Sequence, residues 1–268
     1  MNQDARPRAE ESAADARNQF FAAVEHHQAG RLVEAEQLYR AIIAGGHAIA
    51  EAHNNLGFLL YQRGDRLGAL AEYRKAVEIK PADPGSLNNL GNALRDLGNP
   101  GEAEACYRRA LSIRQDHPEA NNNLGMMLSD RGQHAEALAC YRKALAVNPG
   151  FVDALNNSAV AVRRTGQADE AIELWKKAIL LRPNSVEAHV YLADTLADLG
   201  MVEEARRHAL IADALDIPPR PALRYALGIA LGKCGFREPA IARLRQCADG
   251  DPQDRYGARL ALAALNEG

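Results

Sequence analysis

Apolar residues along the chain fall into short runs with helical period, and these runs come in pairs that repeat every 34 residues. The units begin near Ala16, Ala50, Pro84, Pro118, Val152, Val186 and Pro221, the last one residue late. One helix pair cannot bury its apolar face alone, so neighbouring pairs must stack into a continuous core. The pattern predicts an all-α solenoid of about seven helix–turn–helix units over residues 16–254.

Several positions hold the same kind of residue in nearly every unit. The turn between the helices carries Gly30, Gly64, Gly98, Gly132, Gly166, Gly200 and Gly235. Small residues follow at Ala35, Ala69, Ala103, Ala137, Ala171, Ala205 and Ala240, and glycine returns on the first helix at Gly57, Gly91, Gly125 and Gly228. Aromatic residues mark the second helix at Tyr39, Tyr73, Tyr107, Tyr141 and Trp175. Small residues on facing helices predict closely packed helix axes.

This pattern resembles the tetratricopeptide repeat family over roughly residues 16–254. The second unit carries the resemblance in Leu56, Gly57, Gly64, Ala69, Tyr73, Ala76 and Pro81. The resemblance implies a right-handed superhelix in which the first helices line a concave groove and the second helices form the convex back.

Both ends depart from the repeat. The polar stretch MNQDARPRAEESAAD predicts a disordered N-terminal arm over residues 1–15. At the other end, residues 255–268 are expected to form a capping helix, roughly Arg255–Asn266. Its surface is rich in Ala and Leu rather than polar, so this helix could instead cover another surface.

Asparagine recurs at one phase of the first helix although it is a mediocre helix former. In the frame of the resemblance, the groove side holds Asn55, Asn89, Asn123 and Asn157. A primary amide offers one acceptor and two donors, so it can hold a peptide backbone without reading side chains. Adjacent helices lie about 10 Å apart, which matches about three residues of extended chain. We therefore expect an asparagine ladder that binds an extended polypeptide.

A purely structural role is the alternative for these amides. We favour it for the preceding asparagine of each pair, namely Asn54, Asn88, Asn122 and Asn156. The ladder also resembles the repeats of O-linked N-acetylglucosamine transferases, which grip extended substrates. We expect no glycosyltransferase domain to follow the repeats.

Further peptide-binding candidates lie beside the ladder. They are Asn92, Arg95, Asp96, Asp130, Arg163, Arg164, Asp194 and Asp198, whose mixed charges would select a bound segment, unless they only pair between helices. At the N-terminal mouth Phe20, Phe21 and Phe58 could form an apolar pocket, and Tyr191 and Tyr225 stand at the far end. A better-known use of the fold that this chain resembles is to bind acidic C-terminal tails of chaperones through a carboxylate clamp. That clamp needs lysine at the positions held here by Phe20, Asn54, Asn88, Asn122, Asn156, Val190 and Tyr225. None of these is lysine, so we reject this partner class.

Composition narrows the partner class. The 268 residues carry a formal net charge of −3, which argues against nucleic acid as the main partner. No apolar run reaches the roughly 18 residues of a membrane span, and the N-terminus has no secretory signal. The four cysteines form no CxxC pair, which fits a reducing cytoplasm.

No catalytic, phosphate-binding or zinc motif is present, so we expect no enzyme activity, metal or cofactor. The sequence favours a protein–protein interaction scaffold that binds an extended segment of another protein in its groove. One alternative is a substrate-recruiting subunit of a peptide-modifying enzyme such as a glycosyltransferase. A second is a self-assembling scaffold, that is, a homo-oligomer.

Overall fold

The computed structural model describes residues 5–47, 49–215 and 220–267, and over these residues it consists of 15 α-helices without a strand. The chain divides into two compact units, residues 1–127 and residues 128–268. Consecutive helices pack in pairs in each unit, which confirms the predicted fold class, an α-solenoid.

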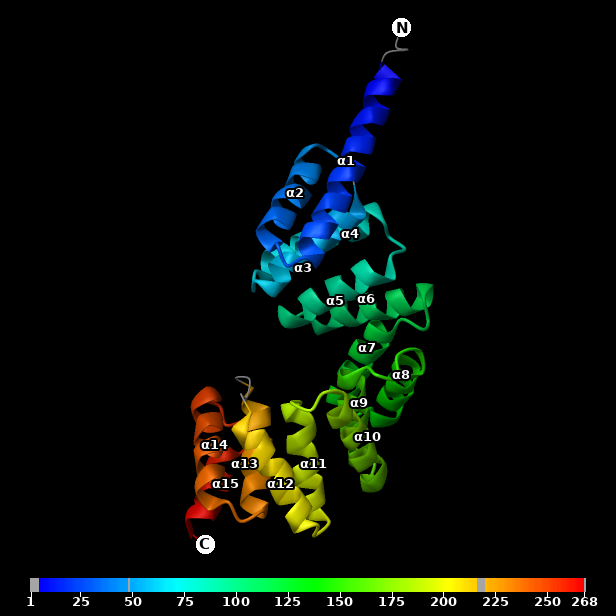
Figure 1. Cartoon of the computed structure of the whole chain (residues 1–268). Coiled ribbons are helices and arrows are strands. Elements are labelled where there is room, and N and C mark those ends of the chain that lie inside the picture. Colours follow the sequence, from blue (N-terminus) through cyan, green and yellow to red (C-terminus); the bar gives the residue numbers. More distant parts are fainter. Residues whose placement is uncertain (1–4, 48, 216–219, 268) are drawn as a thin grey trace. The chain divides into compact units, whose positions relative to one another are not determined.

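The first unit contains α1 to α6 and most of α7 (Figure 1). Its helices are α1 (Ala5–Gln28), α2 (Leu32–Ala44), α3 (Ala50–Gln62), α4 (Arg66–Ile79), α5 (Pro84–Asp96), α6 (Pro100–Ile113) and α7 (Pro118–Asp130). Each helix from α1 to α5 packs against the next one, and α3 also contacts α5. The first helices of neighbouring repeats therefore lie side by side.

The second unit runs from the end of α7 to α15. Its helices are α8 (His134–Val147), α9 (Val152–Arg164), α10 (Ala168–Leu181), α11 (Val186–Asp198), α12 (Val202–Ala214), α13 (Pro221–Lys233), α14 (Arg237–Gly250) and α15 (Ala258–Glu267). The first helices α9, α11 and α13 contact one another in turn.

Six predicted unit starts coincide with helix starts, those of α3, α5, α7, α9, α11 and α13. The start of α5 shows why. Asp83 precedes the helix and its carboxylate accepts the Ser86 N–H at 2.8 Å, while Pro84 occupies the first turn, where its missing N–H is not needed. Local chemistry thus sets the boundary.

The small residues allow the two helices of a pair to approach closely. The alanine that follows each turn is fully buried in every unit, as at Ala69 and Ala103. A Cβ added to Gly91 would lie only 2.5 Å from the ring of Tyr107, so this glycine is required for the contact. Gly64 adopts a φ of 86°, the left-handed region that the turn needs.

The two ends differ from the predicted boundaries. The first helix begins at Ala5, so the expected disordered arm is wrong from that residue onward, and residues 1–4 lie outside the described part. Alanine, glutamate and arginine dominate residues 5–17, and they are strong helix formers.

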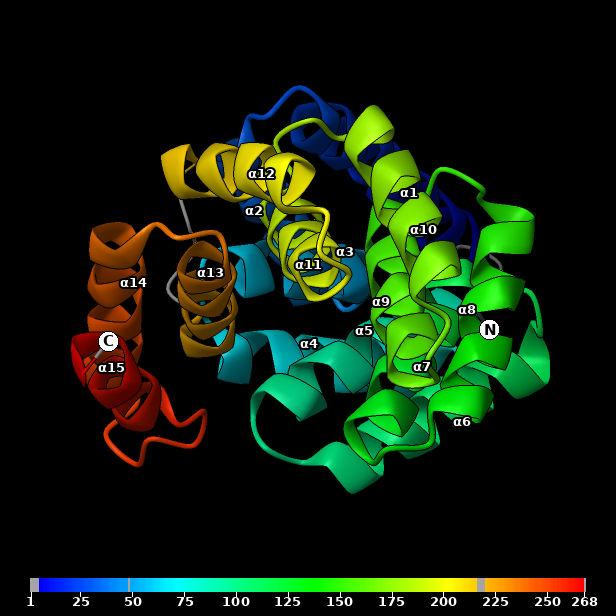
Figure 2. The ribbon, with the colours of Figure 1, turned by 90° about the horizontal axis from the view of Figure 1, so that it is seen from below.

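The last helix begins at Ala258, three residues later than predicted, because Gly257 has a φ of 73° that ends any helical run before it. Its inner face packs Ala261, Leu262 and Leu265 against the core beside Leu244. Figure 2 shows α15 lying against α14. This helix therefore covers the apolar side of the last repeat.

Candidate functional site

A chain of side-chain amides joins the first helices of the N-terminal unit. Asn55 on α3 donates to the Tyr39 hydroxyl at 3.2 Å, and Asn54 donates to Asn55 Oδ1 at 3.4 Å. Asn89 on α5 donates to Asn54 Oδ1 at 3.0 Å. The second asparagine of one repeat thus bonds to the first asparagine of the preceding repeat.

The same arrangement recurs one repeat later. Asn88 donates weakly to Asn89 Oδ1 at 3.5 Å, and Asn123 on α7 donates to Asn88 Oδ1 at 2.9 Å. Asn123 also donates to Asn92 Oδ1 at 3.0 Å, and Asn92 accepts a further bond from the Tyr107 hydroxyl at 2.8 Å. We call the set Asn54, Asn55, Asn88, Asn89, Asn92 and Asn123 the amide network.

The amide network changes the predicted ladder. Asn123 is buried at 9% exposure and both of its N–H groups bond within the chain, so the expectation that it projects into an open groove is wrong. Asn55 and Asn89 are half-buried and each donates one bond within the described chain, which leaves one N–H of each amide unused. These two side chains remain able to bind a ligand.

The sequence carried a signal for this network that the 34-residue period concealed. The bonded pairs Asn54–Asn89 and Asn88–Asn123 are 35 residues apart, so each joins the first asparagine of one unit to the second of the next. The 34-residue period instead relates Asn55 to Asn89, and these two residues do not bond to each other.

In the second unit, the repeating asparagine is replaced by an aromatic residue. Asn156 on α9 is buried and donates to the Ser185 hydroxyl at 3.3 Å, while its Oδ1 has no partner among the described residues. The position that carries the donor amide in the first unit is held here by Tyr191, whose ring stacks on Trp175 with centroids 6.2 Å apart. Asn157, on the same helix, is half-buried.

Charged candidates in the second unit form ion pairs between helices. Arg163 on α9 lies 2.7 Å from Asp194 and 2.6 Å from Asp198, both on α11. Lys233 on α13 lies 2.5 Å and 2.6 Å from the same two carboxylates. Burial alone would raise the pKa of Asp198, but its bonds to Lys233 and Arg163 outweigh burial and the pKa lies below the ordinary value. Interhelix pairing, the alternative named above, is what the structure shows for these three candidates.

The first unit contains a similar charged cluster. Asp96 accepts a hydrogen bond from the Tyr61 hydroxyl and pairs with Arg95 at 3.3 Å and with Arg66 at 3.4 Å. Burial, and then the bond to Asp96, raises the pKa of Tyr61. Asp130 at the end of α7 and Arg164 at the end of α9 are exposed, as are the paired Asp96 and Asp198.

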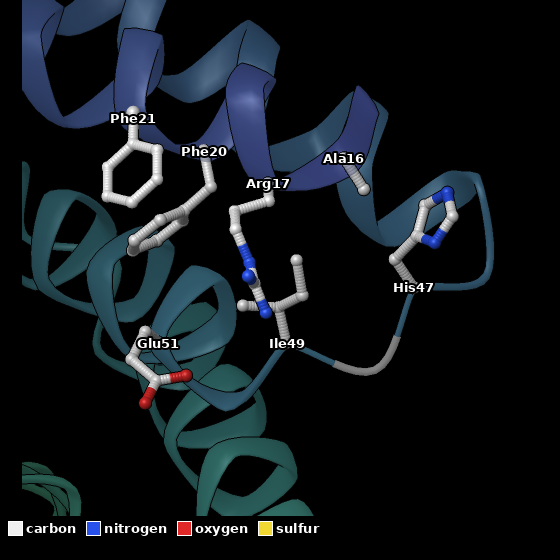
Figure 3. A pocket seen from close by; sticks show the side chains of 7 residues that line it. All are labelled: Ala16, Arg17, Phe20, Phe21, His47, Ile49 and Glu51. Atoms are coloured by element: carbon white, nitrogen blue, oxygen red, sulfur yellow. The ribbon is translucent and has the colours of Figure 1, made fainter. Parts of the chain in front are cut away.

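A hollow of about 570 Å³ opens between α1 and the segment that leads into α3 (Figure 3). Its lining residues are Ala16, Arg17, Phe20, Phe21, His47, Ile49 and Glu51. Phe20 and Phe21 were predicted for a pocket at this end. Phe58 does not line the hollow and instead contacts the ring of His27, with centroids 5.8 Å apart. The two tyrosines predicted at the far end have different ring partners. Tyr225 lies against Tyr256, whereas Tyr191 stacks on Trp175.

Sequence reasoning missed Arg17, Ile49 and Glu51 because the hollow exists only where α1 passes over the segment after α2. The α1 wall, Ala16 to Phe21, lies within the first predicted unit, but nothing in the sequence indicated that the segment after α2 would face it. The available signal was the spacing of Arg17, Phe20 and Phe21, which places all three on one helical face.

The described residues contain no group of three or more His, Cys, Asp or Glu side chains placed to hold a metal ion. Within the same part of the chain, no helix combines the length and the apolar character needed to cross a membrane. The four cysteines are free thiols, and burial raises the pKa of Cys106, Cys234 and Cys247. The site offers amides, aromatic rings and charges, which suit recognition.

Comparison with known proteins gives three matching family models, each described as tetratricopeptide repeat. They match residues 48–116, 118–151 and 162–214, together more than half of the chain. No curated protein matches the sequence.

Similar solved structures include a tetratricopeptide repeat protein from Parabacteroides merdae, with a TM-score of 0.67 and 19% identity over 93% of this chain and 98% of the other. The structure of pilF from Pseudomonas aeruginosa has a TM-score of 0.65 and 20% identity over 80% of this chain and 97% of the other. A chain of the APC/C hetero-tetramer Cut9-Hcn1 reaches a TM-score of 0.75 at 15% identity, over 91% of this chain and 48% of the other. At these identities the likeness concerns the fold.

Proposed function

Because the chain belongs to the tetratricopeptide repeat family, we propose that it is a scaffold that binds an extended segment of another protein along its first helices. Members of this family generally mediate protein–protein interactions. The observation that carries the finer proposal is the pair of half-buried amides Asn55 and Asn89, which occupy equivalent positions on the adjacent helices α3 and α5 and each keep one N–H unused.

The amide network supports this proposal by holding both side chains in place. Asn55 is oriented by Tyr39, and Asn89 is oriented by Asn54, so neither amide loses much rotamer freedom when a ligand binds. Packed helices are separated by about 10 Å, which an extended peptide spans with three residues. Each unused N–H can therefore meet a backbone carbonyl of the same bound segment.

In the second unit, selectivity would come from a charge that is not paired within the described chain. Arg164 on α9 is exposed and forms no ion pair with any described carboxylate, so it can attract an acidic side chain without breaking an internal contact. Arg163, Asp194 and Asp198 already pair with one another, and a ligand could use them only by replacing those contacts. We therefore place the first contacts of a bound segment in the first unit. Catalysis by the chain itself is not part of this proposal.

The test uses a library of random twelve-residue peptides displayed on phage and selected against the immobilised full chain. Selected peptides are synthesised, and their affinity is measured by fluorescence anisotropy for the wild type and for Asn55→Ala/Asn89→Ala. Losing two hydrogen bonds to the peptide backbone of about 0.5–1.5 kcal/mol each should weaken binding by about 5-fold to about 150-fold.

The matched control is Asn99→Ala. Asn99 is exposed at the start of α6 and its side chain makes no capping hydrogen bond, so its affinity should equal that of the wild type. Circular dichroism verifies that both variants keep their helix content. Selected peptides that bind Asn55→Ala/Asn89→Ala as tightly as the wild type would show that the amides do not hold the ligand.

Self-association is a second candidate function, favoured by one observation on α15. Leu260 is 78% exposed, although the other face of this helix packs into the core of the last repeat. A large exposed apolar side chain on a terminal helix is a natural contact for a second copy. Light scattering of the wild type and of Leu260→Glu tests this, because the substitution leaves the core contacts of α15 intact. A wild type that stays monomeric at every concentration removes this candidate.

A further inference from the structure

The aromatic side chains at the hollow beside α1 are more exposed than those of the second helices. The aromatic rings of the second helices are buried, as with Tyr39 at 0% exposure, whereas Phe21 is 57% exposed. Phe20 beside it is held by Tyr39, with ring centroids 6.1 Å apart, and Phe21 lies 6.2 Å from Phe20. One ring is thus fixed and the other stands open at the edge of the hollow (Figure 3).

The size and lining of the hollow fit a side chain rather than water alone. Its volume of about 570 Å³ lies in the range of about 300–1,000 Å³ that small-ligand sites occupy. Ala16, Phe20, Phe21 and Ile49 supply an apolar wall. An exposed aromatic ring next to such a wall gains free energy when an apolar group from a partner covers both.

The charges around the hollow are unbalanced. Glu51 is held by Lys80 at 2.8 Å, and this hydrogen bond, together with backbone hydrogen bonding, lowers the pKa of Glu51. Arg17 forms no ion pair with any carboxylate of the described side chains, and it reaches over the hollow between Phe20 and Ile49 (Figure 3). Among the described side chains, the hollow therefore presents one positive charge without an ion pair beside an apolar wall.

We propose that this hollow is the anchor site for a partner segment that carries a large apolar side chain next to a carboxylate. The apolar side chain lies against Phe20, Phe21 and Ile49, and the carboxylate pairs with Arg17. The carboxylate belongs to an acidic residue of the same partner segment.

The anchor site deepens the proposed function and rests on it. Phe21 stands 34 residues before Asn55, at the equivalent position of the preceding repeat, so both lie on the same face of successive first helices. A segment held by Asn55 and Asn89 that continues toward α1 arrives at the hollow. The amides would grip the backbone without reading the sequence, and the anchor site would supply the choice of sequence.

The test begins with the phage library described above, displayed in two formats, one with a blocked and one with a free peptide C-terminus. The wild-type chain should enrich, in both formats, peptides in which a Leu, Ile, Phe or Met adjoins Asp or Glu. Enrichment in the free-end format alone would show that the site binds a terminal carboxylate, which would overturn the assignment to an acidic side chain. Arg17→Glu should replace the acidic preference by Lys or Arg.

The strongest wild-type peptide then serves as the probe in fluorescence anisotropy. Phe21→Ala should weaken its binding by about 10-fold, a loss typical of an aromatic contact at the centre of an interface. Arg17→Gln should weaken it by about 3-fold, and the effect should shrink as salt concentration rises. Replacing the carboxylate of the peptide should have no further effect on Arg17→Gln.

Two controls use matched substitutions outside the hollow. Val33→Ala removes another apolar side chain that is 63% exposed, and Arg245→Glu reverses another exposed arginine. Both should bind the probe like the wild type. Phe21 is exposed, so its replacement should leave folding intact, and circular dichroism verifies this.

The outcomes separate the anchor site from the amide contacts. A probe whose binding depends on Asn55 and Asn89 but not on Phe21 or Arg17 overturns the anchor site and leaves the proposed function standing. A probe that depends on Phe21 and Arg17 but not on the two amides supports the anchor site and contradicts the amide contacts. Selection of no peptide, together with a dimer that Phe21→Ala dissociates, assigns the hollow to self-association and overturns the anchor site.

Discussion

Removing Asn123 tests whether the amide network stabilises the fold. Asn123 on α7 donates 2.9 Å and 3.0 Å hydrogen bonds to Asn88 and Asn92 on α5, and both Asn123 and Asn88 are buried. Asn123→Ala deletes both bonds at once. Asn92 keeps its bond from Tyr107, whereas Asn88 Oδ1 loses its donor.

The expected cost follows from these contacts. Two hydrogen bonds contribute about 0.5–1.5 kcal/mol each, and a buried carbonyl oxygen left without a donor costs a further ~1–3 kcal/mol. Alanine returns up to about 0.7 kcal/mol through its higher helix propensity. We expect Asn123→Ala to lower the free energy of unfolding by about 1–5 kcal/mol.

The double variant Asn88→Ala/Asn123→Ala isolates the bond between the two amides. Each single change leaves a buried polar group unpaired, and the double change removes both groups together. The double variant should therefore cost less than the sum of the single variants, with a coupling energy of about 1–2 kcal/mol. The exposed Asn99→Ala provides the baseline for an asparagine without a structural bond.

Urea unfolding followed by circular dichroism at 222 nm measures these free energies. Because long repeat arrays can unfold in stages, hydrogen exchange should accompany it and locate the loss of protection in α5 and α7. An Asn123→Ala variant as stable as Asn99→Ala, or strictly additive single and double variants, would show that the amide network does not stabilise the fold. An asparagine reserved for a ligand would give that result.

Three other substitutions test further contacts. Gly91→Ala should lower stability by about 1–3 kcal/mol because its Cβ would meet a tyrosine ring at 2.5 Å, whereas Gly101→Ala, with open space around it, should raise stability by up to about 1 kcal/mol; equal effects in urea unfolding would contradict the packing argument. Lys233→Met should lower the free energy of unfolding at neutral pH, and its difference from the wild type should shrink below about pH 4. The pKa of Asp198 is depressed in the folded chain, so its ion pair with Lys233 stabilises the fold above the ordinary carboxyl pKa and this stabilisation is lost on acidification. A difference that stays constant down to about pH 2 would refute this. Burial lowers the pKa of His208, so the unfolded chain takes up this proton first and the wild type should lose more stability than His208→Gln between pH 7.5 and pH 5.5; identical losses would exclude His208 as the cause.

The repeat period alone determined the architecture of this protein. The starts of α3, α5 and α13 coincide with the predicted unit starts, and the turn glycines adopt the left-handed backbone that the pattern implied. These features depend on residues close together in sequence, on helix caps, on backbone freedom at glycine and on volume at Gly91. A regular sequence therefore carries them in every unit.

Only the tertiary structure decided what the polar side chains do. Asn123 had the sequence context of a ligand-binding amide, yet it is buried against α5, and Arg163, expected beside the groove, pairs with α11. The hollow at Phe21 depends on α1 passing over the segment that follows α2. The partners of these side chains come from neighbouring helices tens of residues away, and small differences in helix packing decide whether a polar group meets another helix or solvent. A periodic sequence places residues on a face, but it does not determine which of them remain unpaired once the faces have packed.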